Sequence, residues 1–164
     1  MKIKAAALAL LLSSGMATAE MPVQLSGGWD GARVPAGEQC KLHGGNGSTP
    51  PMLVSGIPQG TKWIITDFND LSYQPLSKNG GHGRIGYPVS GSTAKLPAVP
   101  GMTAKLPAGA QVIKAARGKG KYASPGYLPP CSGGRGNRYS VDLRAVDGAG
   151  KVLETLSKVA IGKY

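Results

Sequence analysis

Few residues of this chain carry side chains suited to acid–base or nucleophilic chemistry. The 164 residues contain two histidines, His43 and His82, and two cysteines, while Asp and Glu together number 8. His82 with Asp67 or Asp70 would supply a base and the carboxylate that orients it. However, no Gly-x-Ser-x-Gly segment or other recognisable elbow presents a nucleophile. We therefore expect a binding protein rather than an enzyme, and no cofactor is implied.

The first residues are typical of a secretory signal peptide, which we assign to residues 1–19. Two lysines precede an apolar run at residues 5–12, and an Ala-Thr-Ala sequence provides the small residues of a cleavage site. The apolar run is too short to span a bilayer, and no transmembrane segment is predicted after it. The sequence therefore predicts one domain, residues 20–164, that is periplasmic or secreted.

The cysteines are Cys40 and Cys131. In an exported chain an even number of cysteines favours a disulfide. This bond would close a loop of about 90 residues, for which the chain-entropy model gives at most roughly 4–5 kcal/mol. Cys40 and His43 are also spaced like metal ligands, but the chain has no second pair of this kind. No metal site is therefore expected.

The net charge of +11 is unevenly distributed along the chain. No acidic residue lies between Asp70 and Asp142, whereas many Lys and Arg residues do. Such a one-signed segment favours anionic partners, for example phosphate groups or acidic lipid surfaces. Nucleic acid is not expected, because the chain is predicted to be exported, has few aromatic residues and offers no basic helix for a groove. The competing interpretation is a solvated basic surface that serves solubility.

Residues 118–147 form the stretch that the other elements must support. A loop rich in Gly, Pro and Lys carries Tyr122 and Tyr127 into a Pro-Pro-Cys turn, and a second glycine loop follows. From residue 139 to 146 apolar and polar residues alternate, which is typical of a strand with one buried face. Polar groups on a loop braced by a strand commonly form binding sites. An ordinary loop before an ordinary strand fits the same residues equally well.

The remaining pattern favours short strands. Strands are predicted at residues 52–54, 62–68 and 84–89. Residues 93–109 are expected to form an extended surface excursion, because their prolines exclude a helix. At residues 150–161 the apolar spacing is helical, with a strand as the competing interpretation. Because 26 Gly and 13 Pro impose many turns, the sequence predicts a single all-β or β-rich domain with short peripheral helical segments.

Three blocks of the chain, in order, share a wider pattern. The first is CKLHGGNGSTPPMLVSGIPQGTKWIITDF, the second begins at His82, and the third combines LPAG, ARGKGKYASPGYLPPC and GNRYSVDLRAVD. Their order and spacing resemble the phosphatidylethanolamine-binding protein family, in particular its bacterial relatives of the Raf kinase inhibitor proteins. The blocks cover most of residues 29–147. The resemblance implies that family's β-rich fold and its small anion pocket.

At the implied pocket the sequence departs from the family pattern. Asn69 stands where the family's Asp-Pro-Asp-Ala motif begins, Gly83 replaces a tryptophan, and Asn137 replaces the histidine of His-Arg-Tyr. The resemblance also brings the loops of Cys40 and Cys131 near one another. It implies a ligand-binding set with one acidic residue and several donors: Asp70, His82, Tyr127, Asn137 and Arg138.

Three members of this set have alternative roles. Without the resemblance, His82 is best interpreted as a loop histidine that is hydrogen-bonded to the backbone. Arg138 is able to bind a phosphate bidentately, but an internal pairing with Asp70 or Asp67 is favoured, because an arginine that opens a central strand would otherwise be buried unpaired. Tyr127 is equally compatible with packing.

The expected function is therefore non-enzymatic binding of a small anion, either phosphate or a phospholipid headgroup. A phosphate presents only acceptors, and His82, Tyr127, Asn137 and the backbone N–H groups of the glycine loop at 132–136 are donors. The alternative is a protein-interaction or inhibitor module that uses the basic segment 93–121 as its contact surface, with a vestigial pocket.

Overall fold

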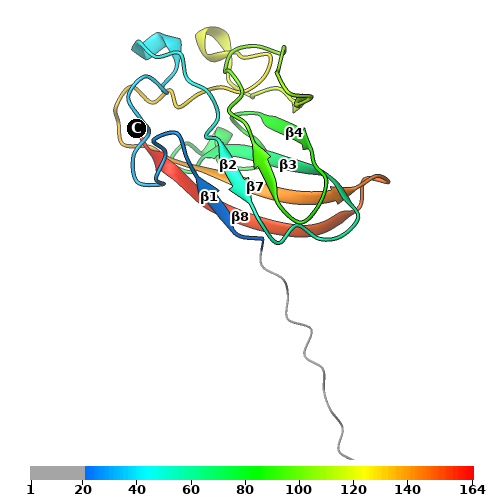
Figure 1. Cartoon of the computed structure of the whole chain (residues 1–164). Coiled ribbons are helices and arrows are strands. Elements are labelled where there is room, and N and C mark those ends of the chain that lie inside the picture. Colours follow the sequence, from blue (N-terminus) through cyan, green and yellow to red (C-terminus); the bar gives the residue numbers. More distant parts are fainter. Residues whose placement is uncertain (1–20) are drawn as a thin grey trace, which may run out of the picture.

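Two antiparallel sheets make up the described part of the chain (Figure 1). The computed structural model describes residues 21–164, so the predicted signal peptide lies outside the described residues. The sheet orders are β1-β2-β5 and β6-β4-β3-β7-β8. The strands are β1 (Val23–Leu25), β2 (Met52–Val54), β3 (Thr61–Asp70), β4 (Arg84–Pro88), β5 (Ala94–Leu96), β6 (Gln111–Lys114), β7 (Arg138–Asp147) and β8 (Val152–Lys163).

The prediction of a β-rich single domain is confirmed. Its helical segments, within residues 21–164, are short 3-10 turns: η1 (Lys41–His43), η2 (Gln74–Leu76) and η3 (Gly120–Tyr122). No helix in this range is long and apolar enough to cross a membrane. Figure 1 shows η1 and η3 at the same end of the fold, where the long loops also gather. The sheets therefore form the scaffold, and the loops at this end carry the variable chemistry.

Strands β3 and β7 lie at the centre of the larger sheet, as the sequence predicts. Phe68 pairs with Val141 and Thr66 with Leu143 in an antiparallel register. The alternation predicted for β7 is present, since its apolar face is buried while its polar face is more open; the buried set is Tyr139, Val141, Leu143 and Ala145. This face forms the core because successive side chains of a strand point to opposite sides.

The smaller sheet packs on the same core. Met52, Val54 and Leu96 belong to one hydrophobic cluster with Ile64 and Leu143 of the larger sheet. The expectation that residues 93–109 form a surface excursion is therefore wrong for their first half. Leu96 and Val99 are fully buried, and β5 pairs with β2. Proline excludes a helix there but not a strand at the edge of a sheet.

The C-terminal segment is a strand, so the competing interpretation is the correct one. β8 pairs with β7, and the pairing register shifts at three places. Lys158, with φ of 57°, marks one such irregularity. Each bulge moves the following residues to the other face of the strand. As a result, the apolar residues of β8 fall at intervals that resemble a helical repeat.

Candidate functional site

A cavity of about 520 Å³ lies where four loop segments meet at the end of β3 and β7. Its wall combines aromatic and aliphatic side chains with a few polar and charged groups. The lining residues come from 70–76, from the turn at residue 82, from 117–122 and from 128–139. This volume is within the range of small-ligand sites in proteins. Of the predicted set, Asp70, His82 and Asn137 line the cavity.

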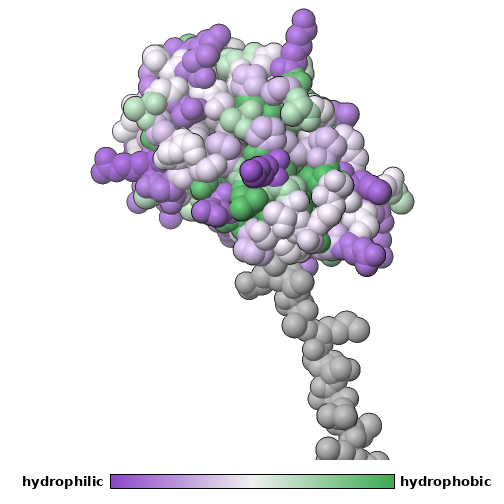
Figure 2. Space-filling model, viewed as in Figure 1, coloured by the Kyte–Doolittle hydropathy of each residue, from purple (hydrophilic) through white to green (hydrophobic). Residues whose placement is uncertain are grey.

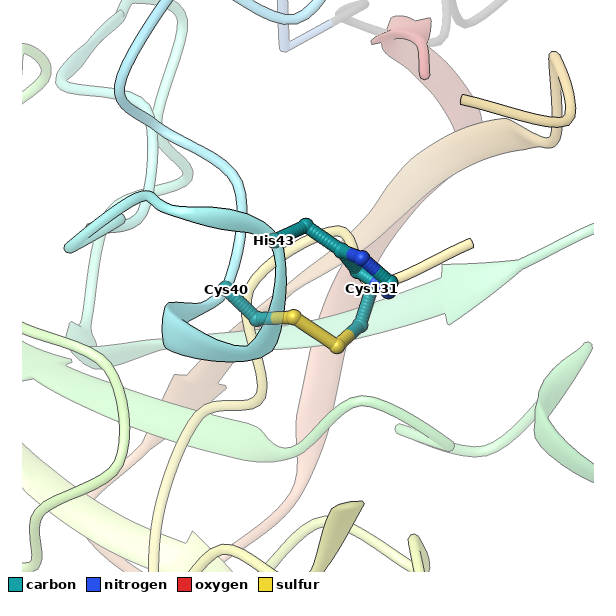
Figure 3. Close-up of side chains that lie close together, drawn as sticks. All are labelled: Cys40, His43 and Cys131. Atoms are coloured by element: carbon teal, nitrogen blue, oxygen red, sulfur yellow. A yellow bond between two sulfur atoms is a disulfide. The ribbon is translucent and has the colours of Figure 1, made fainter. Parts of the chain in front are cut away.

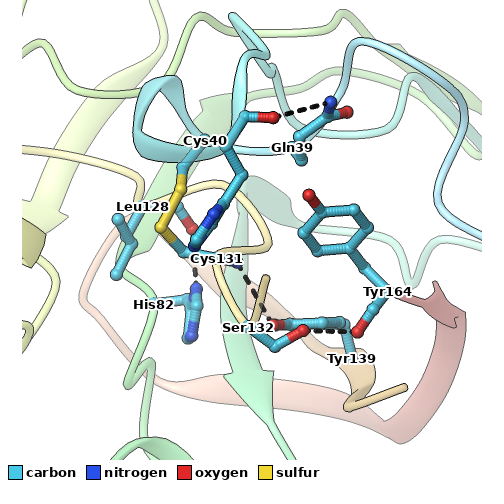
Figure 4. The surroundings of a disulfide bond; sticks show 9 residues. Gln39, Cys40, His82, Leu128, Cys131, Ser132, Tyr139 and Tyr164 are labelled. Carbon is cyan, nitrogen blue, oxygen red and sulfur yellow. Dashed lines mark hydrogen bonds between the residues drawn. A yellow bond between two sulfur atoms is a disulfide. The ribbon is translucent and has the colours of Figure 1, made fainter. Parts of the chain in front are cut away.

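His82 is positioned by the end of β3 and by the 126–131 loop. Its backbone N–H donates to the Phe68 carbonyl (2.8 Å), and its carbonyl accepts from the Leu128 N–H (2.8 Å). The imidazole Nδ1 makes a further bond of 2.7 Å to the Leu128 carbonyl oxygen (Figure 4). The ring also packs edge-on against Tyr139, at 5.3 Å between centroids. The side chain is therefore fixed by backbone groups rather than by a carboxylate.

Asn69 holds the turn that presents His82. Its side-chain oxygen accepts from the N–H groups of Gly80 (3.0 Å) and Gly81 (3.2 Å). A Cβ at Gly81 would overlap the Leu76 carbonyl, so only glycine allows this close approach. The side chain of Asn69 thus has a structural role. It lies behind the pocket, where an amide both accepts from the turn and donates to Asp142 (3.1 Å).

The hydrogen bond to Leu128 determines the protonation of the imidazole. A carbonyl oxygen only accepts, so Nδ1 carries the hydrogen, and in the neutral ring Nε2 is left with a lone pair. Burial lowers the pKa of His82, against the opposing effects of the Leu128 carbonyl and the Asp70 charge. The neutral form is therefore favoured in the folded protein. In this form Nε2 accepts a proton rather than donating one.

Asp70 pairs with Asn137, so the predicted pair of Asp70 and Arg138 is wrong. The Asn137 amide donates to Asp70 Oδ2 (2.7 Å), and the Ser72 N–H donates to Oδ1 (2.9 Å). Arg138 is exposed at the start of β7, where its backbone N–H donates to the Ser72 hydroxyl (3.0 Å). Because Arg138 is exposed, its charge does not require an acidic partner inside the protein. The residue also does not line the cavity.

Asp67 instead forms salt bridges with two other arginines, Arg84 and Arg144. Arg84 Nη2 donates to Asp67 Oδ2 (2.9 Å), and Arg144 Nη1 lies 3.1 Å from the same oxygen. The Asp67 hydrogen bond raises the pKa of Arg84, which keeps the guanidinium charged. Asp67 pairs with Arg84 across β3 and β4, and Arg144 is two positions away on β7. These three residues consequently face the same side of the sheet.

Tyr127 belongs to the core rather than to the cavity wall. Only 1% of its surface is exposed, and its ring lies 4.8 Å from that of Phe68. Burial raises the pKa of Tyr127 well above its ordinary value. The tyrosines that line the cavity are Tyr73, Tyr122 and Tyr139. Burial also raises the pKa of Tyr139 to about 12, so its phenol stays protonated, and its oxygen accepts from the Cys131 N–H (3.2 Å).

Three basic residues in the cavity wall were not singled out as ligands in the sequence. Arg117, Lys119 and Arg135 line the cavity, with Asp70 as the acidic residue. The Arg117 guanidinium donates to the carbonyls of Pro75 and Lys78 as well as Asn79, so it holds that loop in place. Lys119 and Arg135 are exposed at the rim. The sequence feature that could have indicated these three residues is the segment between Asp70 and Asp142, which contains no acidic residue.

The predicted disulfide is present between Cys40 and Cys131 (Figure 4). It joins the first loop block to the loop that follows Leu128, with Cα atoms 5.2 Å apart. Cys131 lines the cavity, so the bond fixes one of its walls. Both sulfurs pack in a small cluster with Leu76 and Leu128. His43 lies beside the disulfide, and its nitrogen and the two sulfurs are the one grouping of metal-type ligands in the described residues.

Comparison with known proteins identifies no relative. No protein-family model matches this chain, and no curated protein or solved structure matches it either. The resemblance to the phosphatidylethanolamine-binding proteins therefore stays a prediction.

Proposed function

We propose that this protein is an exported, non-enzymatic binding protein, similar to the phosphatidylethanolamine-binding family, that holds a phosphate-like group in the cavity. The observation that carries the proposal is the charge of the wall. Arg117, Lys119 and Arg135 surround a cavity whose carboxylate, on Asp70, is already hydrogen-bonded by Asn137 and Ser72. Their field attracts an anion, and the partial enclosure of the site strengthens that attraction relative to open water.

The polar groups at the inner wall suit an oxyanion. One N–H of the Asn137 amide binds Asp70, which leaves the second for a ligand. His82 becomes a donor through Nε2 when it is protonated, or accepts from a ligand that brings its own proton. The rings of Tyr73 and Tyr122, which also line the cavity, offer apolar area for the carbon atoms of an organic phosphate. Inorganic phosphate and a phospholipid headgroup share this chemistry.

Binding without conversion is favoured by how the acid–base groups are held. His82 Nδ1 is bonded to a backbone carbonyl, so neither nearby aspartate orients the ring as in a base–carboxylate pair. Asp67 is neutralised by two arginines on another side of the sheet.

The second candidate is a protein-interaction module that uses the basic segment 93–121. Its support is that β6 is an edge strand whose Ile113 is 48% exposed, with Lys114 exposed beside it. Edge strands present unpaired backbone groups to another chain. On the face in Figure 2, however, hydrophilic side chains are spread over the surface rather than gathered in one patch. An experiment distinguishes this candidate from the anion-binding proposal: if the protein is an interaction module, substitutions in the cavity would leave partner binding unchanged.

Calorimetry with inorganic phosphate and phosphoethanolamine tests the proposal. In the double variant Lys119→Ala with Arg135→Ala, we expect affinity for both ligands to fall about tenfold or more, because two charges near the anion are lost. The matched control, Lys62→Ala with Lys151→Ala, removes the same charge from exposed sites that do not line the cavity. Its affinity should change little, because salt screens distant charges. Equal losses in both double variants would contradict a site in the cavity.

The source of the phosphate group is a separate question for the same assay. Tighter binding of phosphoethanolamine than of phosphate would indicate an organic ligand. Sedimentation with vesicles that contain phosphatidylethanolamine would then distinguish a headgroup in a membrane from a free phosphate ester. No binding of either small ligand by the wild-type protein would move the assignment to the interaction module.

A further inference from the structure

Three potential metal ligands from two distant loops meet beside the cavity. The Sγ atoms of Cys40 and Cys131 and an imidazole nitrogen of His43 all lie within 4.8 Å of one another. Figure 3 shows the His43 ring reaching over toward Cys131. The cysteines are 91 positions apart in the sequence, so the fold alone brings the third ligand to the Cys40–His43 pair. In the oxidised protein the sulfurs are bonded to each other and are not thiolates, the form that binds metal.

The two loops are also joined by bonds that do not depend on the disulfide. The Cys40 N–H donates to the Pro130 carbonyl (2.9 Å), which links the two loops directly. The Cys131 N–H donates to the Tyr139 hydroxyl (3.2 Å), which fixes the second loop on β7. The loops pack closely as well, since a Cβ at Gly47 would lie 2.8 Å from Pro129. Reduction of the disulfide therefore leaves the two sulfurs facing each other.

His43 is held with its ring nitrogens available. Its backbone is fixed in η1, where the His43 N–H donates to the Cys40 carbonyl (3.0 Å) and the Gln39 amide donates to the His43 carbonyl (3.2 Å). The ring lies against Gly133, where a Cβ would be 3.0 Å from the imidazole Cε1, and 6.3 Å from the ring of Tyr164. Neither ring nitrogen forms a hydrogen bond to another group within residues 21–164.

We propose that reduction of Cys40–Cys131 creates a Cys-Cys-His site for a thiolate-seeking cation such as Zn²⁺. Two equivalents of a thiol reductant become one disulfide, and the protein gains two thiols. The cation then displaces both thiol protons and binds two thiolates and the neutral His43 imidazole. Two negative sulfurs balance the charge of a divalent ion, so binding does not add to the net positive charge of the chain. The proposal does not depend on the anion-binding function.

The geometry suits such an ion. With metal–sulfur bonds of about 2.3 Å, a tetrahedral ion holds its two sulfurs about 3.8 Å apart, so the sulfurs, which the disulfide keeps at bonding distance, must separate after reduction. The His43 nitrogen already lies within 4.8 Å of both sulfurs. Small side-chain rotations after reduction are therefore sufficient. Thiolate with imidazole is also a ligand set that favours zinc over magnesium or calcium. Three protein ligands leave a fourth position, which water occupies in open sites.

Cobalt titration of the reduced protein tests the site, because Co²⁺ replaces Zn²⁺ and gives a thiolate charge-transfer band. Reduced wild-type protein, kept without oxygen, should bind one Co²⁺ with this band, and Zn²⁺ should abolish it. The oxidised protein and the variant Cys40→Ser with Cys131→Ser should show no band. His43→Asn should weaken binding about tenfold or more, whereas His82→Gln, which removes the other histidine, should not.

Folding is followed by near-ultraviolet circular dichroism in the same samples. If the reduced chain loses its tertiary structure, the metal should restore it, because binding to a formed site is coupled to folding. Absence of a band in reduced wild-type protein, with or without folding, would overturn the proposal. Equal affinity in wild type and His43→Asn would also overturn it, since the sulfurs would then bind without the imidazole.

Discussion

Asp67 and Asp70 lie three residues apart on β3, and both are almost fully buried, with 1% and 4% of their surfaces exposed. Their surroundings differ completely. Asp67 is bound by Arg84 and Arg144 from the two neighbouring strands. Asp70 is bound by the amide of Asn137 and the N–H of Ser72, and it borders the cavity. The first carboxylate is closed off by the sheet, whereas the second is surrounded by loops.

The difference follows from the period of a strand. Residues three apart point to opposite faces, so Asp67 meets the polar side chains that its neighbours present, while Asp70 points toward the core side at the very end of the strand. A carboxylate with two guanidiniums has its charge neutralised and serves stability. A carboxylate held only by neutral donors at the cavity wall can orient groups around a ligand. The cluster of Asp67 with Arg84 and Arg144, which we call the closed end, should control stability. The loops around Asp70 and the cavity, which we call the loop end, should control binding.

The largest effect is expected from the bond that holds the loop end together. Replacing both cysteines, as Cys40→Ala with Cys131→Ala, should lower the free energy of unfolding by about 4 kcal/mol, since the loop of about 90 residues is then free in the unfolded chain. Urea unfolding measures this, and anion binding by the folded variant should weaken as well. Thiol labelling of denatured, unreduced wild type should detect no free cysteine. Two labelled cysteines would contradict the disulfide.

The next effect tests the closed end directly. Asp67→Asn should cost about 3 kcal/mol, because it leaves two partly buried guanidiniums without a counter-charge. Asp70→Asn should cost about 1 kcal/mol, because a neutral oxygen still accepts from Ser72 and the Asn137 amide can reorient. Thermal unfolding of the two variants gives the comparison. Conversely, anion affinity should change in Asp70→Asn and stay constant in Asp67→Asn, and equal behaviour of the two variants would remove the distinction.

The sequence predicted the parts of this arrangement that depend on local pattern. The strands around Phe68 and Val141 follow from alternation, and Cys40–Cys131 follows from an even cysteine count. β8 was ambiguous because bulges such as the one at Lys158 disturb the alternation. A bulge depends on the partner strand, which a local pattern does not contain.

The site was predicted less well because its contacts are non-local. The sequence pairs Arg138 with an aspartate because an arginine that opens a central strand is expected to be buried, but Arg138 is exposed. The register instead gives Asp67 the arginines at 84 and 144. Tyr127 has a hydroxyl that could bind a ligand and a ring that could pack in the core. In the folded protein the ring packs in the core. Arg117 and Arg135 reach the cavity only through the way the loops fold.

His82 provides a smaller effect, on stability, at the loop end. Because burial lowers the pKa of His82, the unfolded chain takes up a proton more readily than the folded one below the unfolded pKa of about 6.5. The contribution of His82 is therefore complete above that pH. It is lost as the pH falls toward the folded pKa, by at most about 1.4 kcal/mol for each pH unit. Urea unfolding at several pH values measures the slope, and His82→Gln should reduce it.

The smallest effect is on anion affinity, and it has the opposite direction. Neutral His82 presents a lone pair at Nε2, so an anion that carries no proton gains a donor there only after the ring is protonated. Sulfate is the right probe, because it does not titrate in this range and phosphate does. Its affinity should rise as the pH falls toward the lowered pKa of His82, by at most about tenfold for each pH unit, since a single proton is taken up. Asn137 does not titrate, so a steeper dependence, as from two histidines, is not expected. In His82→Gln the affinity should be nearly independent of pH, while Tyr127→Phe should keep the wild-type dependence because that ring lies in the core. A flat profile in the wild type would mean that the anion does not contact His82, and the loop end would then bind through its rim cations alone.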